Sequence, residues 1–350
     1  MSNQQPSSEA FMNDLRKMIR AAREALVHVL DTTAEDRVLV VTDEATRLIG
    51  EAFARAAEEI GARSEMVLLP ESERPLEEPT ADMLSALGPC TVVINAFVAR
   101  SEETPFRIRW IRAVLEGHKR RLGHAPGITP DMMISGPMNI DYAELVRNAE
   151  AAIRAFDNAA TVHITAPAGT DIELNIEDRP FQSDVHITTE HFGNLPCGEI
   201  WCAPVEDGAN GVIVCDGSIG DLGKVPAPLR IEVKEGRIVN LQSDDASLVE
   251  KVWELSHVDD EASVVGELGI GLNPGARITG NLLEDEKAFR TAHVAFGNNE
   301  DMIGGRNRSK THRDFLFHRP TIEVTYKDGS KRTLMRDGEL ILPSDNAGTS

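Results

Sequence analysis

Residues 265–318 read VGELGIGLNPGARITGNLLEDEKAFRTAHVAFGNNEDMIGGRNRSKTHRDFLFH, and this stretch decides the interpretation of the second half of the chain. It places acidic and histidine side chains among glycines and short apolar runs, namely Glu267, His293, Glu300, His312 and Asp314. Carboxylates and imidazoles are ligands that divalent transition metals prefer. The stretch therefore predicts a metal site built on strands and loops.

The sharpest local pattern in this stretch is His312-Arg313-Asp314. In an extended segment, alternate side chains point to the same face, so His312 and Asp314 would reach one ion while Arg313 points away. Taken alone, such pairs are common without a metal. Glu267 strengthens the case, because a carboxylate in an apolar, glycine-flanked run is costly to bury without a counter-charge. His293 also lies in an apolar run, where a core histidine is the alternative.

Four strings in this stretch, GELGIGLNP, LEDEK, AHVAFGNN and GGRNRSKTHRDF, occur in an order that resembles the C-terminal signature of the aminopeptidase T family of metallo-aminopeptidases. Residues 195–207, LPCGEIWCAPVED, are similar to that family's other signature, in which the Glu after Gly is a metal ligand. The resemblance covers roughly residues 160–318. It implies metal ligands at Glu199, Glu267, His293, His312 and Asp314, and a homodimer.

One position departs from the family pattern. The family usually has a ligand Tyr seven residues after the first His, and this chain has Glu300 there. We expect Glu300 to bind metal through oxygen. The whole set then implies two divalent ions, Zn²⁺, Co²⁺ or Mn²⁺, that activate water to cleave an amide or N-terminal peptide bond of a small molecule or short peptide. The carboxylate that acts as general base is not identified.

A second, more distant resemblance is to the 2,5-dihydroxypyridine dioxygenases, mononuclear Fe(II) enzymes that share the scaffold. These enzymes have a His where Glu267 stands and no counterparts of Glu199 and His293. Because this chain keeps both residues, the hydrolase is favoured. A ring-cleaving dioxygenase acting on a dihydroxypyridine-like N-heterocycle remains the alternative.

Other polar residues near these motifs have weaker interpretations. His186 and His191 precede the upstream signature and are candidates for proton transfer or substrate binding. Glu206 and Asp207 are candidates to orient Glu199. The run of residues 284–287, EDEK, is most simply a solvated charge run.

The composition limits the partners of the chain. Its 350 residues contain 36 Lys and Arg against 57 Asp and Glu, a formal net charge of −21. Such a charge repels phosphate backbones and anionic lipids, so neither nucleic acid nor a membrane is an expected partner. The polar N-terminus lacks a signal-peptide core, and the few cysteines have no CxxC spacing, which predicts a cytoplasmic protein. We expect Cys197 and Cys202 to pack as small apolar residues.

The first half of the chain alternates buried-type strands with helical patterns. Residues 37–43 (RVLVVTD) form a β-branched run, and helical periodicity follows over residues 44–60. This βαβ rhythm predicts a parallel sheet covered by helices, without a nucleotide-binding glycine motif. From about residue 160 antiparallel hairpin patterns dominate, at 161–165/171–176, 229–233/237–241 and 322–326/332–335.

We therefore predict two domains. Residues 1–159 form an α/β domain, and residues 160–350 form a β-rich, barrel-like α+β domain that carries the metal ligands.

Overall fold

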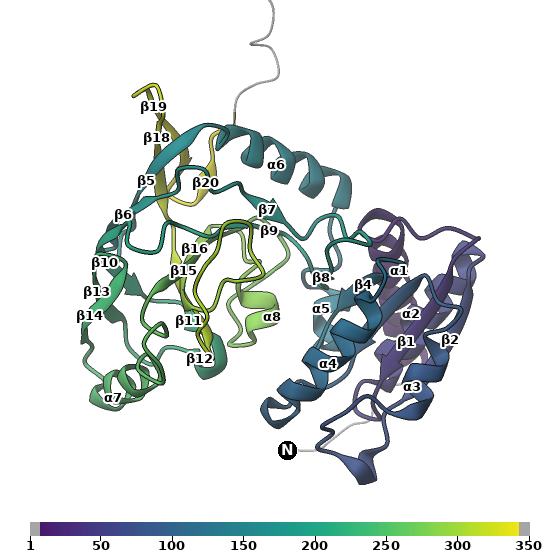
Figure 1. Cartoon of the computed structure of the whole chain (residues 1–350). Helices are drawn as coiled ribbons and strands as arrows, with labels where there is room; N and C mark the ends of the chain where they lie inside the picture. The colour runs from purple at the N-terminus through teal and green to yellow at the C-terminus, as the bar shows by residue number, and fades with distance from the viewer. Residues whose placement is uncertain (1–7, 343–350) are drawn as a thin grey trace, which may run out of the picture. The chain divides into compact units, whose positions relative to one another are not determined.

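The computed structural model describes residues 8–342, and its contacts divide the chain into two compact units. The first comprises residues 1–144 and 184–197, and the second comprises residues 145–183 and 198–350. Figure 1 shows helices and a parallel sheet in the purple to blue part of the chain, and mostly strands in the teal to yellow part.

The first unit contains a parallel sheet with strand order β2-β1-β3-β4-β8. Its strands are β1 (Arg37–Thr42), β2 (Arg63–Leu68), β3 (Val92–Ala96), β4 (Arg121–His124) and β8 (Gly193–Asn194). Every residue of β3 is buried, as are the last five residues of β1. A strand buried on both faces must be covered by helices, which confirms the predicted α/β architecture.

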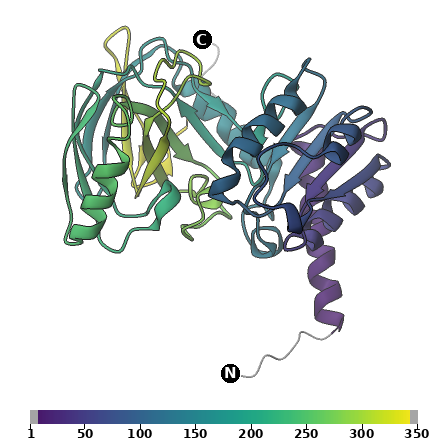
Figure 2. The same cartoon turned by 60° about the horizontal axis from the view of Figure 1, so that its bottom comes forward.

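Helices lie on both faces of this sheet. Leu39 and Val41 pack in one cluster with Met83 and Trp110, whereas Val38 and Val40 point to the opposite face because side chains alternate along a strand. The helices of this unit are α1 (Ser8–His28), α2 (Arg47–Ile60), α3 (Ala81–Ala86), α4 (Thr104–Leu115) and α5 (Pro130–Ile134), with the short 3₁₀ turns η1 (Glu71–Glu73) and η2 (Ser101–Glu103). In Figure 2 the first turns of α1 extend away from the rest of this unit.

A buried ion network closes the carboxyl end of β1. Arg74 donates to Asp43 at 2.5 Å and to Glu103 at 2.5 Å, and all three side chains are inaccessible to solvent. Asp43 also accepts from the main-chain N–H of Val98. Because each charge has a partner, burial is tolerated, but removing one partner would leave an unpaired buried charge.

The units differ from the predicted limits, 1–159 and 160–350, at two places. Helix α6 (Tyr142–Ala155) lies mostly in the second unit, where Ala152 lines a small apolar cavity with Ile200 and Ile270. Residues 184–197 return to the first unit, because β8 pairs with β4 and the N–H of Ile187 donates to the carbonyl of Val29. The chain therefore crosses between the units more than once.

The second unit contains two antiparallel sheets. The eight-stranded sheet has the order β14-β13-β10-β6-β5-β18-β19-β20. Its strands are β5 (Ala159–Thr165), β6 (Asp171–Asn175), β10 (Ala209–Cys215), β13 (Leu229–Lys234), β14 (Arg237–Gln242), β18 (Thr321–Tyr326), β19 (Lys331–Arg336) and β20 (Glu339–Leu340). The three predicted hairpins appear here as β5/β6, β13/β14 and β18/β19.

The seven-stranded sheet has the order β12-β11-β17-β16-β15-β9-β7. Its strands are β7 (Gln182–Ser183), β9 (Glu199–Cys202), β11 (Ser218–Ile219), β12 (Gly223–Lys224), β15 (Val265–Gly271), β16 (Thr291–Gly297) and β17 (His312–His318). The remaining elements are helices α7 (Ala246–Leu255) and α8 (Leu282–Asp285) and the turn η3 (Gly220–Leu222). The β-rich prediction is confirmed, whereas its barrel-like form is not, because neither sheet closes on itself among the described strands.

Among the described helices none combines the length and the apolar character needed to cross a bilayer.

Candidate metal centre

Neighbouring strands of the seven-stranded sheet carry the predicted ligands on one face. Glu267 of β15 and Asp314 of β17 both lie opposite Ala295, which stands between them on β16. Directly opposed residues in antiparallel strands project to the same side. The small Ala295 therefore lets the two carboxylates approach each other above it.

Two further ligand candidates oppose glycines. His293 lies opposite Gly269, and Glu199 lies opposite Gly271. A Cβ at Gly269 would lie 2.0 Å from Nε2 of His293. The absence of a side chain at Gly269 thus leaves the space that the imidazole of His293 occupies, whereas a Cβ at Gly271 would meet the carbonyl oxygen of Ala288.

The structure brings five of the six predicted ligands into two clusters that share Glu267. One contains Glu199, Glu267 and His293, and the other contains Glu267, His312 and Asp314; within each, one possible ligand atom from each residue lies within 4.8 Å of the others. We call these the Glu199 position and the His312 position. Neither contains a cysteine.

The carboxylate of Glu267 joins the two positions. Its Oε1 lies 3.3 Å from Nε2 of His293, and its Oε2 lies 3.1 Å from Nε2 of His312. Oδ1 of Asp314 lies 3.7 Å and 3.5 Å from the same two nitrogens. Each imidazole is therefore directed at a different oxygen of Glu267.

Burial differs between the two positions. The side chain of His312 is 31% exposed, whereas that of His293 is 1% exposed and the three carboxylates are at most 9% exposed. The cluster is therefore open to solvent on the His312 side.

The clustered charges shift the pKa values of their members. Burial opposes ionisation of Glu267, but hydrogen bonds and charges from His293 and His312 outweigh it and hold its pKa well below the usual range. Burial likewise lowers the pKa of His293, but Glu267, Asp314 and Glu199 together raise it to about 9. For His312, Asp314 and Glu267 outweigh burial and raise the pKa well above 6.5. Without a metal ion, the imidazoles therefore hold protons that neutralise the carboxylates.

A main-chain contact orients His312. Its Nδ1 lies 2.7 Å from the carbonyl oxygen of Asn298 and donates its hydrogen there. In the neutral ring this hydrogen bond leaves the lone pair on Nε2, the nitrogen that faces Glu267. His312 is thus prepared to bind a metal through Nε2.

The loop between β16 and β17 is anchored at its base by two buried asparagines. Nδ2 of Asn307 donates to the carbonyls of Val265 and Gly297, and Nδ2 of Asn299 donates to the carbonyl of Gly266. Oδ1 of Asn299 in turn accepts from the main-chain N–H of Asn307. These bonds fix the ends of the loop against the strands that carry the ligands.

Glu300, the sixth predicted ligand, lies on this loop and outside both clusters. Its side chain is 48% exposed and pairs with Arg308 at 2.8 Å. The structure therefore does not bring Glu300 to the other candidates.

The run of residues 284–287, interpreted above as solvated, is instead largely buried. Glu284, Asp285 and Lys287 are at most 2% exposed. Asp285 accepts hydrogen bonds from the main-chain N–H groups of Thr279 and Gly280, so it organises the preceding loop. The solvated interpretation was wrong because a local charge pattern does not reveal these non-local partners.

Two members of that run extend the cluster. Nζ of Lys287 lies 2.5 Å from Oε1 of Glu199 and 2.5 Å from Oε1 of Glu286. Burial is the largest influence on Glu286 and raises its pKa; Lys287 opposes this and Asp314 adds to it. Neither residue was assigned a role from the sequence, although both lie within the string LEDEK, which is part of the family resemblance.

The donor set fits a divalent metal. Donors about 2.0–2.2 Å from one tetrahedral ion lie roughly 3.3–3.6 Å apart, and the contacts between the imidazoles and the carboxylates span 3.1–3.8 Å. Oxygen and nitrogen donors without thiolate suit Zn²⁺, Co²⁺, Mn²⁺ or Fe²⁺.

Other residues proposed from the sequence lie elsewhere. His186 and His191 are exposed residues of the 184–197 segment in the first unit. Cys197 and Cys202 are buried thiols. Glu206, a candidate to orient Glu199, instead pairs with Arg179 at 2.7 Å.

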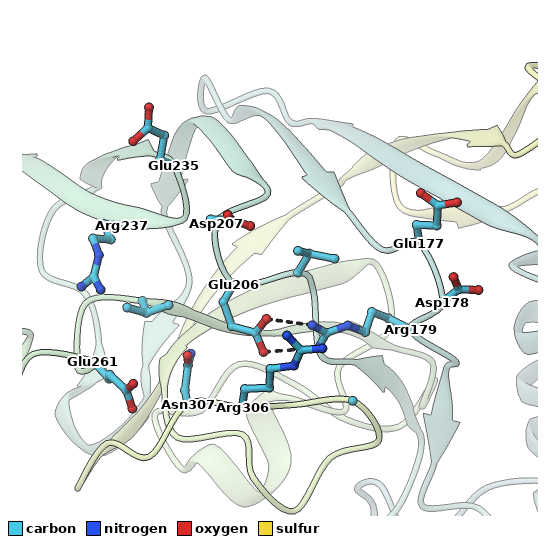
Figure 3. A pocket seen from close by; sticks show the side chains of 13 residues that line it. Glu177, Asp178, Arg179, Glu206, Asp207, Glu235, Arg237, Glu261, Arg306 and Asn307 are labelled. Atoms are coloured by element: carbon cyan, nitrogen blue, oxygen red, sulfur yellow. Dashed lines mark hydrogen bonds and ion pairs between the residues drawn. The ribbon is translucent and has the colours of Figure 1, made fainter.

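This Arg179–Glu206 pair lines a cavity of about 690 Å³ in the second unit, which contains none of the clustered ligands (Figure 3). In Figure 3 the carboxylate of Glu206 faces the guanidinium of Arg179, and Arg306 approaches from the opposite wall. The cavity is thus separate from the candidate metal centre.

Comparisons with solved structures support the fold. The chain superimposes on 2,5-dihydroxypyridine dioxygenase from Pseudomonas putida KT2440 with a TM-score of 0.73 and 17% identity, covering 94% of this chain and 98% of that one. It superimposes on wild-type AmpT from Thermus thermophilus with a TM-score of 0.68 and 17% identity. The superposition covers 93% of this chain and 99% of AmpT. At this identity the likeness shows a shared fold.

Sequence comparisons point to aminopeptidases. The chain is 24% identical to aminopeptidase PepS of Streptococcus thermophilus over 208 residues. This match covers 52% of this chain and 49% of PepS. It is also 24% identical to aminopeptidase AmpS of Bacillus subtilis (strain 168) over 204 residues. This match covers 51% of this chain and 48% of AmpS. The matches thus span about half the length of these curated relatives.

The family comparison covers more than half of the chain. Residues 140–340 match the model described as thermophilic metalloprotease (M29), a range that includes all five clustered ligand candidates. This confirms the resemblance to the aminopeptidase T family, and the chain belongs to the thermophilic metalloprotease (M29) family.

Proposed function

We propose that the chain is a metal-dependent hydrolase that cleaves an amide or N-terminal peptide bond with activated water. The observation that carries the proposal is the carboxylate of Glu267, whose two oxygens face two different imidazoles. A carboxylate in this arrangement suits a bridge between two metal ions. We therefore propose Glu199, Glu267, His293, His312 and Asp314 as ligands of two divalent ions, Zn²⁺, Co²⁺ or Mn²⁺.

The metal, when bound, would lower the pKa of water and polarise the scissile carbonyl. The chain's own residues would hold the reactants and move the proton. The open side at His312 is where substrate would enter, because the remaining ligands are buried. Glu286 is the proposed proton carrier: it belongs to neither ligand cluster, its side chain is 13% exposed, and burial raises its pKa. It would accept a proton from the attacking water and donate it to the leaving amine.

The names of the relatives and the charge of the chain suggest the substrate class. The relatives are named aminopeptidases, so we propose a short peptide or small amide with a free amino group. The net charge of −21 would attract an ammonium group. A homodimer in the cytoplasm belongs to the same proposal.

Chelation followed by metal add-back tests the proposal. The metal-loaded chain should cleave dipeptides and amino-acid amides. This activity should be lost on chelation and regained on addition of Zn²⁺, Co²⁺ or Mn²⁺. Alanine at Glu267 or His312 should abolish turnover with the fold largely intact by circular dichroism. Near-normal turnover in both variants would contradict the assignment.

The alternative hypothesis, a ring-cleaving dioxygenase, predicts a different result. One iron per chain, together with O₂ consumption on a dihydroxypyridine and no cleavage of any amide, would replace the hydrolase with a ring-cleaving enzyme.

A further inference from the structure

Three side chains form a buried hydrogen-bonded chain at the carboxyl edge of the parallel sheet in the first unit. Asn95, near the end of β3, lies in register with His124, the last residue of β4. Nε1 of Trp110 on α4 donates to Oδ1 of Asn95 at 2.7 Å, and Nδ2 of Asn95 lies 3.0 Å from Nδ1 of His124. The chain of bonds ends at the edge where parallel sheets bind their ligands.

These contacts determine which ring nitrogen of His124 carries the hydrogen. The indole N–H of Trp110 can only donate, so the amide oxygen of Asn95 faces it and the amide NH₂ faces His124. Nδ1 of His124 therefore accepts, and in the neutral ring Nε2 carries the hydrogen. Burial and, less strongly, the charge of Arg107 lower the pKa of His124 to about 3, so the ring is neutral near pH 7. His124 is thus a fixed hydrogen-bond donor.

The donor nitrogen of His124 has no acceptor within the described part of the chain. His124 is 8% exposed, and its ring has a hydrogen-bond partner at Nδ1 but none at Nε2 among residues 8–342. Nε2 is not among the fully buried side-chain atoms that lack a partner, so solvent reaches it. A donor that buried groups hold in place and that opens to solvent is suited to bind an oxygen atom of a ligand.

Arg107 places a positive charge beside this donor. It stands three residues before Trp110 on α4, so it lies on the same side of the helix and closer to the helix start, which follows β3. Its guanidinium donates to a main-chain carbonyl and to Oγ1 of Thr104, which leaves other N–H groups for a ligand. Glu103, the carboxylate whose charge acts on Arg107, is itself bound by Arg74.

An exposed aromatic ring lies next to the same histidine. Phe192 is 38% exposed, and its ring meets that of His124 edge to face, with the centroids 6.2 Å apart. It belongs to residues 184–197, the segment that returns to the first unit. An apolar ring beside an N–H donor and a guanidinium fits a ligand that joins a carboxylate to an apolar or aromatic body.

We propose that this edge of the first unit binds a small organic carboxylate. Its oxygens accept from Nε2 of His124 and from the guanidinium of Arg107, and its apolar body lies against Phe192. Because both groups donate and neither has a free lone pair to offer, the site selects an anion over an ammonium group. The site contains none of the metal-ligand candidates, so the inference goes beyond the proposed hydrolase and does not depend on it.

Calorimetric titration of the full chain with benzoate tests the site, because benzoate combines a carboxylate with an aromatic ring. Benzamide has the same ring without the charge and should bind ~10-fold or more weakly, since charge-assisted hydrogen bonds are lost. Arg107→Gln should weaken benzoate binding ~10-fold or more for the same reason. Binding should persist after chelation, because no metal ligand takes part.

Arg109→Gln is the matched control for Arg107→Gln. It removes the same charge from the same helix, but Arg109 points to the opposite side and its pair with Glu78 is exposed at both ends. This variant should bind benzoate like the wild type. No saturable binding of benzoate, equal binding of benzamide, binding that requires a metal, or an equal loss in both arginine variants would each overturn the inference.

Two variants of His124 test the donor itself. His124→Gln offers an amide oxygen to Asn95 and an N–H to the ligand, so it should keep most of the affinity for benzoate. His124→Phe offers neither and should weaken benzoate binding ~10-fold or more. Unchanged affinity in a folded His124→Phe would contradict the assignment. If thermal unfolding shows that His124→Phe does not fold, the comparison of the two arginine variants decides.

Turnover then distinguishes two sources of the carboxylate. If it belongs to the substrate, Arg107→Gln should raise KM for dipeptides and leave KM for amino-acid amides, which lack a carboxylate, unchanged. If it belongs to a separate small acid, the variant should lose benzoate binding with both KM values unchanged. A chain that binds benzoate here and cleaves no amide would retain this site and remove the proposed hydrolase, whereas amide cleavage without benzoate binding would do the reverse.

Discussion

Gly269 of β15 lies directly opposite His293 of β16, and the imidazole occupies the space that any side chain at Gly269 would need. Gly269 has no donor atom of its own to offer a metal. It nevertheless decides where Nε2 of His293 lies, because a Cβ there would be 2.0 Å from that nitrogen.

We therefore expect Gly269→Ala to displace His293 and weaken metal binding about 10–100-fold, as loss of an orienting contact does in other metal sites. Zinc content after dialysis and amide turnover measure the effect. Gly88→Ala is the matched control, because the nearest atom to a Cβ there is 3.7 Å away. Full zinc retention in Gly269→Ala would contradict the explanation.

The metal-free chain should lose stability as the pH rises from about 6.5 to 9. The pKa of His293 is raised from 6.5 to about 9 in the folded chain, so folding favours the protonated ring. That contribution is fully present below pH 6.5 and is lost as the pH rises through 9. Thermal unfolding after chelation measures it, and His293→Gln should show a flatter profile. An equal slope in both proteins would refute the prediction.

Metal affinity should change in the opposite sense over the same pH range. The protons on His293 and His312 must leave before their nitrogens bind an ion. Apparent Zn²⁺ affinity should therefore rise from pH 6.5 to 9, with proton release on binding. Calorimetry in buffers of different ionisation enthalpy counts those protons, and an affinity that falls with pH would argue against imidazole ligands.

Glu300→Ala tests the one predicted ligand that the structure leaves outside the cluster. Because its side chain is half exposed and paired with Arg308, zinc content should remain within about twofold of the wild type, as expected for loss of an exposed ion pair. Asp314→Asn, measured alongside, should lose metal. If both variants lose metal equally, the loop must bring Glu300 to the centre when an ion is bound.

Arg74→Met should destabilise the first unit by about 3–5 kcal/mol, because Asp43 and Glu103 would remain buried without their counter-charge. Chemical denaturation measures this change. Arg109→Ala is the control: its pair with Glu78 is exposed at both ends, so the cost should stay below about 1 kcal/mol.

Local patterns predicted much of the fold. The β-branched run of residues 37–43 and the three hairpin patterns correspond to β1 and to the pairs β5/β6, β13/β14 and β18/β19. Strand β4 (Arg121–His124) was not predicted. The sequence of β4, RLGH, has no strand pattern of its own. The segment is extended because it pairs with β3 and β8. Such distant pairing leaves no local trace.

In the candidate metal centre, too, contacts between distant residues could not be predicted from the local sequence. Glu267, His293, His312 and Asp314 could be proposed from spacing and resemblance, since the ligand face follows from strand alternation. Lys287 could not, because its contact with Glu199 joins residues 88 positions apart. The family pattern also placed Glu300 at a ligand position, whereas the loop turns it toward Arg308.

The asparagine anchors of the β16–β17 loop have a consequence for how this family can diversify. Asn299 and Asn307 bind the main chain of β15 and the end of β16, so the ligand strands are tied to the two ends of the loop, while the N–H of Ile303 in its tip donates to Gln182 of β7. Changes of side chain at residues 300–303 would leave Glu267, His293 and His312 in register, whereas Gly305 has no room for a Cβ beside the carbonyl of Asn299. Directed evolution of new substrate preferences should therefore accept random libraries at residues 300–303 far more readily than any side chain at Gly269, which lies opposite His293.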